Sequence, residues 1–100
     1  MIDRWTAVLA ELERMRSLKD DWDGEGTLAP EAPIIEAAIS NASDMQSWRS
    51  TPPDRVYVSV NGTIYFEWDW GVGYYEMEFV SPEETECRFV DKAKLEASHV

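Results

Sequence analysis

Alternation of large apolar and polar residues over two neighbouring segments constrains the fold most. The segments read IYFEWDW at residues 64–70 and YYEMEFV at residues 74–80. Successive side chains of a strand point to opposite faces, so each segment must bury one face and show the other to solvent. The glycine-containing sequences Asn61-Gly62 and Gly71-Val72-Gly73 bound these segments as turns. The pattern predicts an antiparallel sheet with one packed face.

Apolar residues at helical spacing precede the strands and predict two helices. The first helix is expected over residues 3–18, with Asp3 as its N-terminal cap. The second is expected over residues 31–48, and the sequence STPPD at residues 50–54 ends it. The apolar positions of the two helices are Trp5, Val8, Leu9, Leu12, Met15, Leu18, Ile34, Ile35, Ala38, Ile39, Ala42, Met45 and Trp48.

Four strands are expected over residues 55–60, 63–70, 74–80 and 85–90. For residues 91–98, a short helix and a frayed tail both fit the sequence. Helices that precede a meander of strands can cover one of its faces. The sequence therefore predicts one α+β domain over residues 1–100, with two N-terminal helices packed on one face of a four-stranded antiparallel β-meander and a short C-terminal helix.

Loop lengths predict how the strands face each other. A three-residue loop at residues 60–62, with a bulge at Gly62, places the apolar residues of the first two strands on one face. An even loop around residues 71–73 then pairs Trp70 with Tyr75, which continues that face. The expected core face, covered by both helices, is Val56, Val58, Ile64, Phe66, Trp68, Trp70, Tyr75, Met77, Phe79, Cys87 and Phe89. The opposite face then carries Asp69 against Glu76 and Glu67 against Glu78.

The strand region is acidic and free of basic residues. From residue 56 to residue 87 there is no Lys or Arg, yet seven carboxylates are present: Glu67, Asp69, Glu76, Glu78, Glu83, Glu84 and Glu86. The whole chain has 20 acidic and nine basic residues and a net charge of −11. This balance disfavours binding to nucleic acid or to anionic membranes, and it favours a basic protein partner. The alternative is that the acidity serves solubility.

Like charges that face each other across strands are destabilising, so the acidic face is interpreted as functional. Carboxylates two residues apart on a strand lie roughly 6–7 Å apart, which is similar to the phosphate spacing of a nucleic-acid strand. Tyrosine, with an apolar body and a polar tip, is a favoured interface residue. The predicted partner-binding residues are Tyr65, Glu67, Asp69, Tyr74, Glu76 and Glu78.

These observations predict a non-enzymatic inhibitor that mimics nucleic acid and neutralises a basic, nucleic-acid-processing partner. Such a partner would be a nuclease, a toxin or a defence complex, and the inhibitor a phage anti-defence protein of the anti-CRISPR kind. An antitoxin or immunity protein is the alternative. A metal-binding enzyme is a further one, in which Glu67 with Glu78, or Asp69 with Glu76, shares a proton or holds Mg²⁺. The chain is expected to be a monomer or a weak homodimer without a cofactor.

Histidine and cysteine are too scarce for the common catalytic and metal sites. The single histidine, His99, lies next to the C-terminus, which argues against a Ser-His-Asp or Cys-His arrangement and against a zinc site. Cys87 is the single cysteine, so no internal disulfide forms, and a reducing cytoplasmic compartment is expected. Cys87 itself is interpreted as a small buried hydrophobic residue. No segment is suited to a signal peptide or a membrane span.

The loop at residues 20–26, DDWDGEG, invites a calcium interpretation that its spacing does not support. When Gly24 is aligned with the EF-hand glycine, Lys19 and Pro30 occupy the first and twelfth ligand positions, where carboxylates are needed. The loop is interpreted instead as a turn structure, with Trp22 anchoring it on the core.

The same loop and the following hairpin carry a resemblance. The sequences DWDGEG at residues 21–26, Ala29-Pro30, and NGTIYFEW at residues 61–68 resemble a group of small, uncharacterised bacterial and phage-type proteins, over roughly residues 9–80. Thr27 stands where similar sequences often have alanine. The resemblance implies this order of helices and strands and a bacterial or mobile-element setting, and it implies no activity.

Overall fold

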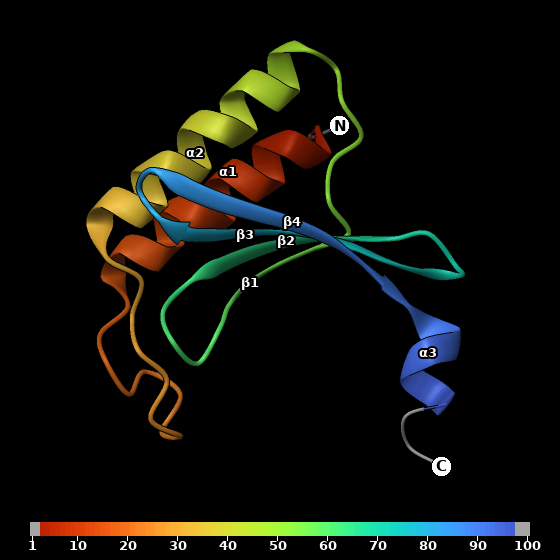
Figure 1. Ribbon diagram of the computed structural model, residues 1–100. Helices are drawn as coiled ribbons and strands as arrows, with labels where there is room; N and C mark the ends of the chain where they lie inside the picture. Colours follow the sequence, from red (N-terminus) through yellow and green to blue (C-terminus); the bar gives the residue numbers. More distant parts are fainter. Residues whose placement is uncertain (1–2, 98–100) are drawn as a thin grey trace.

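The computed structural model describes residues 3–97 and confirms the predicted α+β architecture (Figure 1). Two helices form one layer and a four-stranded antiparallel sheet forms the other. None of the helices within residues 3–97 has the length or the apolar run that a membrane crossing requires. The elements are α1 (Arg4–Arg14) with a 3₁₀ turn η1 (Met15–Ser17), α2 (Ala32–Ser47), β1 (Arg55–Val58), β2 (Ile64–Asp69), β3 (Gly73–Ser81), β4 (Glu84–Asp91) and α3 (Lys92–Ala97).

Local sequence signals explain where the helices begin and end. The Asp3 carboxylate accepts a hydrogen bond from the Trp5 backbone N–H at 3.1 Å, which caps α1 as predicted. Pro33 lies in the first turn of α2, where its missing N–H costs no helical bond. Beyond the end of α2, Arg49 adopts a positive φ of 56°, and the chain turns toward the sheet.

The core lies between the helices and the strands β1 to β3. Two buried tryptophans also find polar partners at the segment that joins the layers. The indole N–H of Trp5 in α1 donates to the Ser50 carbonyl at 2.6 Å, and that of Trp68 in β2 donates to the Thr51 carbonyl at 2.9 Å. The buried apolar residues are Trp5, Val8, Leu12, Met15, Ile34, Ile35, Ala38, Ala42, Ile64, Phe66, Trp68 and Phe79.

The loop between β1 and β2 has the predicted three-residue geometry. Ser59 N–H donates to the Thr63 carbonyl at 2.9 Å, and Gly62 N–H donates to the Ser59 carbonyl at 3.0 Å. Gly62 has a φ of 80°, as a bulge at this position requires. A Cβ at Gly62 would also lie 3.0 Å from the Ala29 carbonyl oxygen, because the residue 20–29 loop packs on this turn. The predicted pairing of Val56 with Phe66 is confirmed.

The predicted pairing of β2 with β3 is wrong by two residues. Trp70 N–H donates to the Gly73 carbonyl at 2.9 Å, so the loop contains only Gly71 and Val72, and Gly71 supplies the positive φ of 82°. Trp68 therefore faces Tyr75, whereas the longer loop predicted Met77. A shift of two residues leaves every side chain on its expected face, so the alternation of apolar residues could not detect the error.

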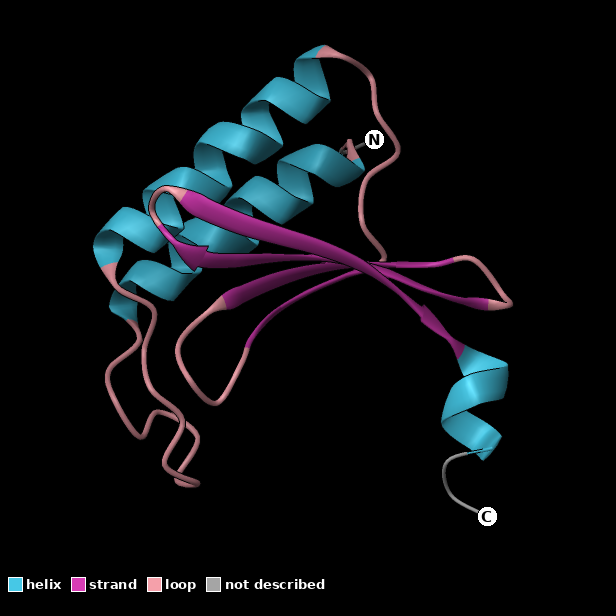
Figure 2. Cartoon of the chain, in the orientation of Figure 1, coloured by secondary structure: helices cyan, strands magenta, loops and turns pink. Residues whose placement is uncertain are grey.

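The helices cover less of the sheet than predicted. They end before the β2–β3 turn, and the twisted sheet runs on past them toward α3 (Figure 2). Trp70 is 63% exposed and Phe89 is 48% exposed, although both were expected under the helices. The interpretation of Cys87 as a buried residue is also wrong, because it is exposed on β4.

Candidate protein-binding surface

The sheet face opposite the helices, called the open face here, brings together all six predicted binding residues. They lie side by side on β2 and β3, where Glu67 faces Glu76, Tyr65 faces Glu78, and Asp69 faces Tyr74. The predicted pairs of Asp69 with Glu76 and Glu67 with Glu78 are therefore wrong. Glu67 and Glu76 are directly opposed between β2 and β3, and Glu78 faces Glu86 between β3 and β4.

Most of the acidic side chains on the open face are covered. The side chain of Glu67 is 8% exposed, that of Glu78 is 14% exposed and that of Glu76 is 17% exposed. Asp69, at the end of β2, is 46% exposed. Charged groups this well covered need partners within the protein, because loss of hydration disfavours the charged form.

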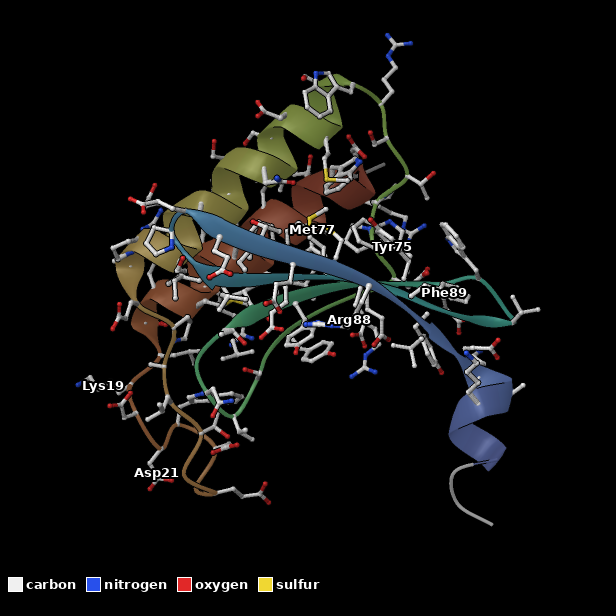
Figure 3. All side chains as sticks on the ribbon, in the orientation of Figure 1. Lys19, Asp21, Tyr75, Met77, Arg88 and Phe89 are labelled. Carbon is white, nitrogen blue, oxygen red and sulfur yellow. The ribbon has the colours of Figure 1, made fainter. Side chains whose placement is uncertain are left out.

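Arg88 on β4 supplies the central partner. Its guanidinium lies 2.5 Å from the Glu78 carboxylate, 3.3 Å from that of Glu86 and 3.9 Å from that of Glu76. It also lies over the Tyr65 ring, with 5.7 Å between Cζ and the ring centroid. Figure 3 shows Arg88 on the open face and Met77 on the helix side of the sheet.

Arg55, on β1, is the cation that pairs with Glu67 of β2. Its guanidinium lies 3.4 Å from the Glu67 carboxylate and 4.9 Å from the centroid of the Tyr57 ring. The Tyr57 and Tyr65 rings are stacked, with centroids 5.0 Å apart and an angle of 3° between the planes. The two stacked tyrosine rings thus lie across β1 and β2, beside the opposed Glu67 and Glu76.

Lys92, the first residue of α3, pairs with Asp69 at the end of β2. Its ammonium group lies 3.0 Å from the Asp69 carboxylate and 4.6 Å from the centroid of the Tyr74 ring. The Asp69 carboxylate also accepts the Gly71 backbone N–H at 2.8 Å. The hydrogen bond from Gly71 and the Lys92 cation hold the pKa of Asp69 below its ordinary value. Each group of acids on the open face therefore has its own cation, and each cation lies on a tyrosine.

The environment of Glu78 favours its charged form. Burial alone would raise the pKa of Glu78, but hydrogen bonds from Thr63 (2.7 Å) and Tyr65, together with Arg88, outweigh burial and lower it. Burial and the hydrogen bond to Glu78 raise the pKa of Tyr65 to about 12. The Tyr65 phenol therefore keeps its proton and donates a hydrogen bond to the ionised Glu78 carboxylate.

Sequence reasoning did not pair the acids with these three cations, because the cations lie outside the acidic segments. Arg55 precedes the base-free run and Arg88 follows it, so the sequence alone places both at the ends of the strand region, and it gives Lys92 no role. The signal that could have found Arg88 is its place in the final strand. A strand of residues 84–91 folded back on β3 puts Arg88 directly opposite Glu76, in the middle of the face.

A second surface lies on the helix side, where α1 and α2 leave the sheet uncovered. A cleft of about 310 Å³ opens there, and Trp70 stacks on Tyr75 at its edge, with ring centroids 5.7 Å apart. The Phe89 ring lies 6.1 Å from that of Trp70 and reaches over Gly73, where a Cβ would come within 2.4 Å of it. The cleft is lined by Met45, Ser50, Thr51, Trp68, Trp70, Tyr75 and Met77.

The loop at residues 20–26 is held together by its own hydrogen bonds. Asp23 accepts the backbone N–H of Glu25 and both the N–H and the hydroxyl of the buried Thr27. Asp21 accepts the N–H of Gly26 at 2.8 Å. The predicted anchoring by Trp22 is wrong, since its side chain is 44% exposed. The acidic residues of this loop act as turn-stabilising acceptors.

No group of three or more His, Cys, Asp or Glu side chains that could hold a metal ion is present in the part of the chain that the structure describes. His99 lies outside the described residues. Searches of protein-family models, curated proteins and solved structures found no match for this chain.

Proposed function

We propose that this chain is a non-catalytic protein-binding module that inhibits a basic, nucleic-acid-processing partner. The observation that carries the proposal is the net charge of −11 on a chain of 100 residues. Complementary charge accelerates encounter with a basic surface and discriminates against acidic competitors.

The distribution of the cations strengthens this argument. Six of them already form ion pairs with carboxylates of the same chain, so they contribute little positive potential of their own. These cations are Arg4, Arg14, Arg16, Arg55, Arg88 and Lys92. The remaining carboxylates dominate the field that a partner meets.

The open face is the surface that best combines this charge with recognition. Tyr65 and Tyr74 present aromatic area held in place by stacking and by cation–π contacts, and interfaces favour rigid tyrosines. Asp69 offers an exposed carboxylate at the rim. A partner's arginine would compete with Arg88 and Lys92 for the paired acids, so binding of this kind is an exchange of cations. A face of paired acids is therefore a weaker nucleic-acid mimic than the sequence alone predicts.

Capture of partners from a bacterial lysate, followed by inhibition assays on each captured protein, tests the proposal. The decisive variant is Asp69→Asn with Glu76→Gln, which removes two negative charges from the open face without adding bulk. The matched control is Glu13→Gln with Glu36→Gln, which removes two carboxylates paired with Arg16 on the helices.

The proposal requires that a captured basic protein loses activity on adding the wild-type chain, and that the open-face variant inhibits less well than the control. Equal inhibition by both variants would reject the open face as the contact surface. Captured proteins that are acidic, or whose activity does not change, would reject the inhibitor function. A captured toxin encoded beside this chain would identify an antitoxin within the same class.

A further inference from the structure

The two edges of the sheet differ in how well they are protected from pairing with another strand. β1 has four residues and follows Pro52 and Pro53. β4 has eight residues, with no proline and no lysine between Glu84 and Asp91. Proline, lysine and short length are three of the means that block an edge, and β4 has none of these three. It does carry charges of both signs, and its pairing with β3 is irregular between Phe79 and Ser81. Its outer backbone groups are available for a further strand.

Backbone hydrogen bonds at the ends of β3 determine which residues of β4 present those groups. Trp70 N–H bonds to the Gly73 carbonyl, and Lys92 N–H bonds to the Val72 carbonyl at 3.1 Å. Bonding direction alternates along an antiparallel strand, so even-numbered residues of β4 bond to β3 and odd-numbered residues bond outward. The outward set is Thr85, Cys87 and Phe89, together with Asp91 at the end of the strand.

We propose that β4 pairs antiparallel with β4 of a second copy of this chain, on a two-fold axis at Cys87. In this arrangement Cys87 faces Cys87 of the second copy, and Thr85 faces Phe89 of the second copy. These are the outward-bonding residues, so each facing pair exchanges two backbone hydrogen bonds. The two sheets then form one continuous sheet, with both helical layers on the same side.

Charge selects this register. With the axis at Cys87, Glu86 of each copy faces Arg88 of the other, which places opposite charges directly across the strands. An axis one residue earlier would face Glu86 with Glu86 of the second copy. An axis one residue later would face Arg88 with Arg88 of the second copy. The alternation of acid, thiol and base at residues 86–88 is therefore complementary to itself in a single symmetric register.

The pairing also covers apolar surface that the single chain leaves in water. Phe89 and Cys87 lie on the helix side of β4, where α1 and α2 do not reach, and both are exposed. Their neighbours across β3 are Tyr75 and Met77 (Figure 3). In the paired sheet this apolar row continues through Cys87 into the second copy. Burial of Phe89 and Met77 adds a hydrophobic contribution to the backbone bonds.

Cross-linking through the single cysteine tests the register. Facing residues of a hydrogen-bonded pair have Cα atoms roughly 5.5 Å apart, so a short bismaleimide should join the two copies at Cys87. The reaction is run at about 0.5 M NaCl, because screening at this salt concentration weakens repulsion between the two acidic chains. The products are then separated on a denaturing gel. The control carries Cys87→Ser with Glu25→Cys, which moves the thiol to an exposed loop distant from β4, and it should remain monomeric.

A charge-exchange experiment tests the pairing without relying on the thiol. Glu86→Lys and Arg88→Glu each place like charges across the proposed axis, so each variant alone should be a monomer. Mixing them restores opposite charges in both facing pairs, so the mixture should sediment as a heterodimer. Thermal unfolding of each variant checks that it is folded. If Arg88→Glu does not fold, loss of the dimer in Glu86→Lys, a substitution at an exposed position, tests the pairing by itself.

The proposal is upheld by cross-linking at Cys87 that the control lacks, together with a concentration-dependent dimer that Glu86→Lys abolishes. It is overturned if light scattering shows only monomer from micromolar to millimolar concentration. A dimer that Glu86→Lys leaves intact would overturn it as well. Neither result bears on the inhibitor function, because the variants that test that function leave β4 unchanged.

Discussion

Both terminal nitrogens of Arg88 donate to one oxygen of Glu78, at 3.2 and 2.5 Å, across the β3–β4 pairing. This bond brings a positive charge into the middle of a sheet whose acidic strands contain no basic residue between positions 56 and 87. The stability of the open face should therefore depend on Arg88 more than on any other cation of the chain.

Replacement of Arg88 by glutamine is predicted to lower the free energy of unfolding by roughly 1.5–3 kcal/mol, the range for hydrogen bonds to charged groups. Urea denaturation measures the change. The control is Arg14→Gln, whose i,i+3 pair with Glu11 is exposed and screened by solvent, so its loss should change the free energy of unfolding much less. Equal losses in the two variants would show that Arg88 acts as an ordinary surface cation.

The lowered pKa of Glu78 predicts an acid-dependent loss of stability. A carboxyl whose folded pKa is depressed binds fewer protons in the folded state than in the unfolded state, so its contribution is present above the ordinary value of 4.5 and is lost as the pH falls through the folded pKa. Unfolding free energies measured at successive pH values below neutral should show this fall. In Glu78→Gln the fall should be shallower than in the wild type, and an unchanged slope would contradict the lowered pKa of Glu78.

Burial and the hydrogen bond to Glu78 raise the pKa of Tyr65 from its ordinary value of 10.0 to about 12, so the phenol should ionise in strong base. A raised folded pKa means that its contribution to stability is present below pH 10 and is lost as the pH rises toward 12. Ultraviolet difference titration of the wild type and of Tyr65→Phe isolates this component. A component that disappears from the region near pH 10 in the variant would contradict the hydrogen bond to Glu78.

Trp68 and Trp70 are predicted to differ sharply in their contribution to stability, although they are two residues apart on the same face. Trp68 is 6% exposed, so Trp68→Ala should cost roughly 3–5 kcal/mol. Trp70 contributes mainly its stacking on Tyr75 and its tilted contact with the Phe89 ring, so Trp70→Ala should cost about 0.5–1.5 kcal/mol. Thermal unfolding compares the two, and similar losses would mean that the helices cover Trp70 in solution.

Asp23 is predicted to stabilise the residue 20–26 loop without any metal. Asp23→Ala leaves the buried Thr27 hydroxyl without its acceptor and should measurably lower the melting temperature. Glu25→Ala, at an exposed position of the same loop, should change little. Addition of CaCl₂ should leave the melting temperature of the wild type unchanged, and a clear rise would establish a calcium site there.

The faces of the sheet could be predicted from the sequence, whereas the pairing of β2 with β3 could not. Alternation assigns Phe66 and Trp68 to the core whatever the register, because a shift of two residues preserves it. Only the length of the turn distinguishes the two registers. The sequence around Gly71 and Val72 is compatible with a two-residue loop and with a longer one. The β1–β2 register was predictable because Gly62 fits one loop geometry better than the others.

Exposure of the binding residues was beyond prediction for a different reason. Whether Glu67 is free or covered depends on side chains that reach it from other strands, and Arg55 does so from β1. The extent of the helical layer was equally hidden, because the apolar character of Trp70 and Phe89 is the same under a helix and in an open cleft. Composition reveals an acidic chain, and the contacts alone show how its charges are distributed.

The two indoles that bond to consecutive carbonyls have a consequence for unfolding. Trp5 belongs to the helical layer and Trp68 to the sheet, yet they hold Ser50 and Thr51 of the same connection. Release of either layer frees that connection and removes a partner from the other layer. The helices and the strands should therefore melt in one concerted transition, with both tryptophans reporting the same midpoint.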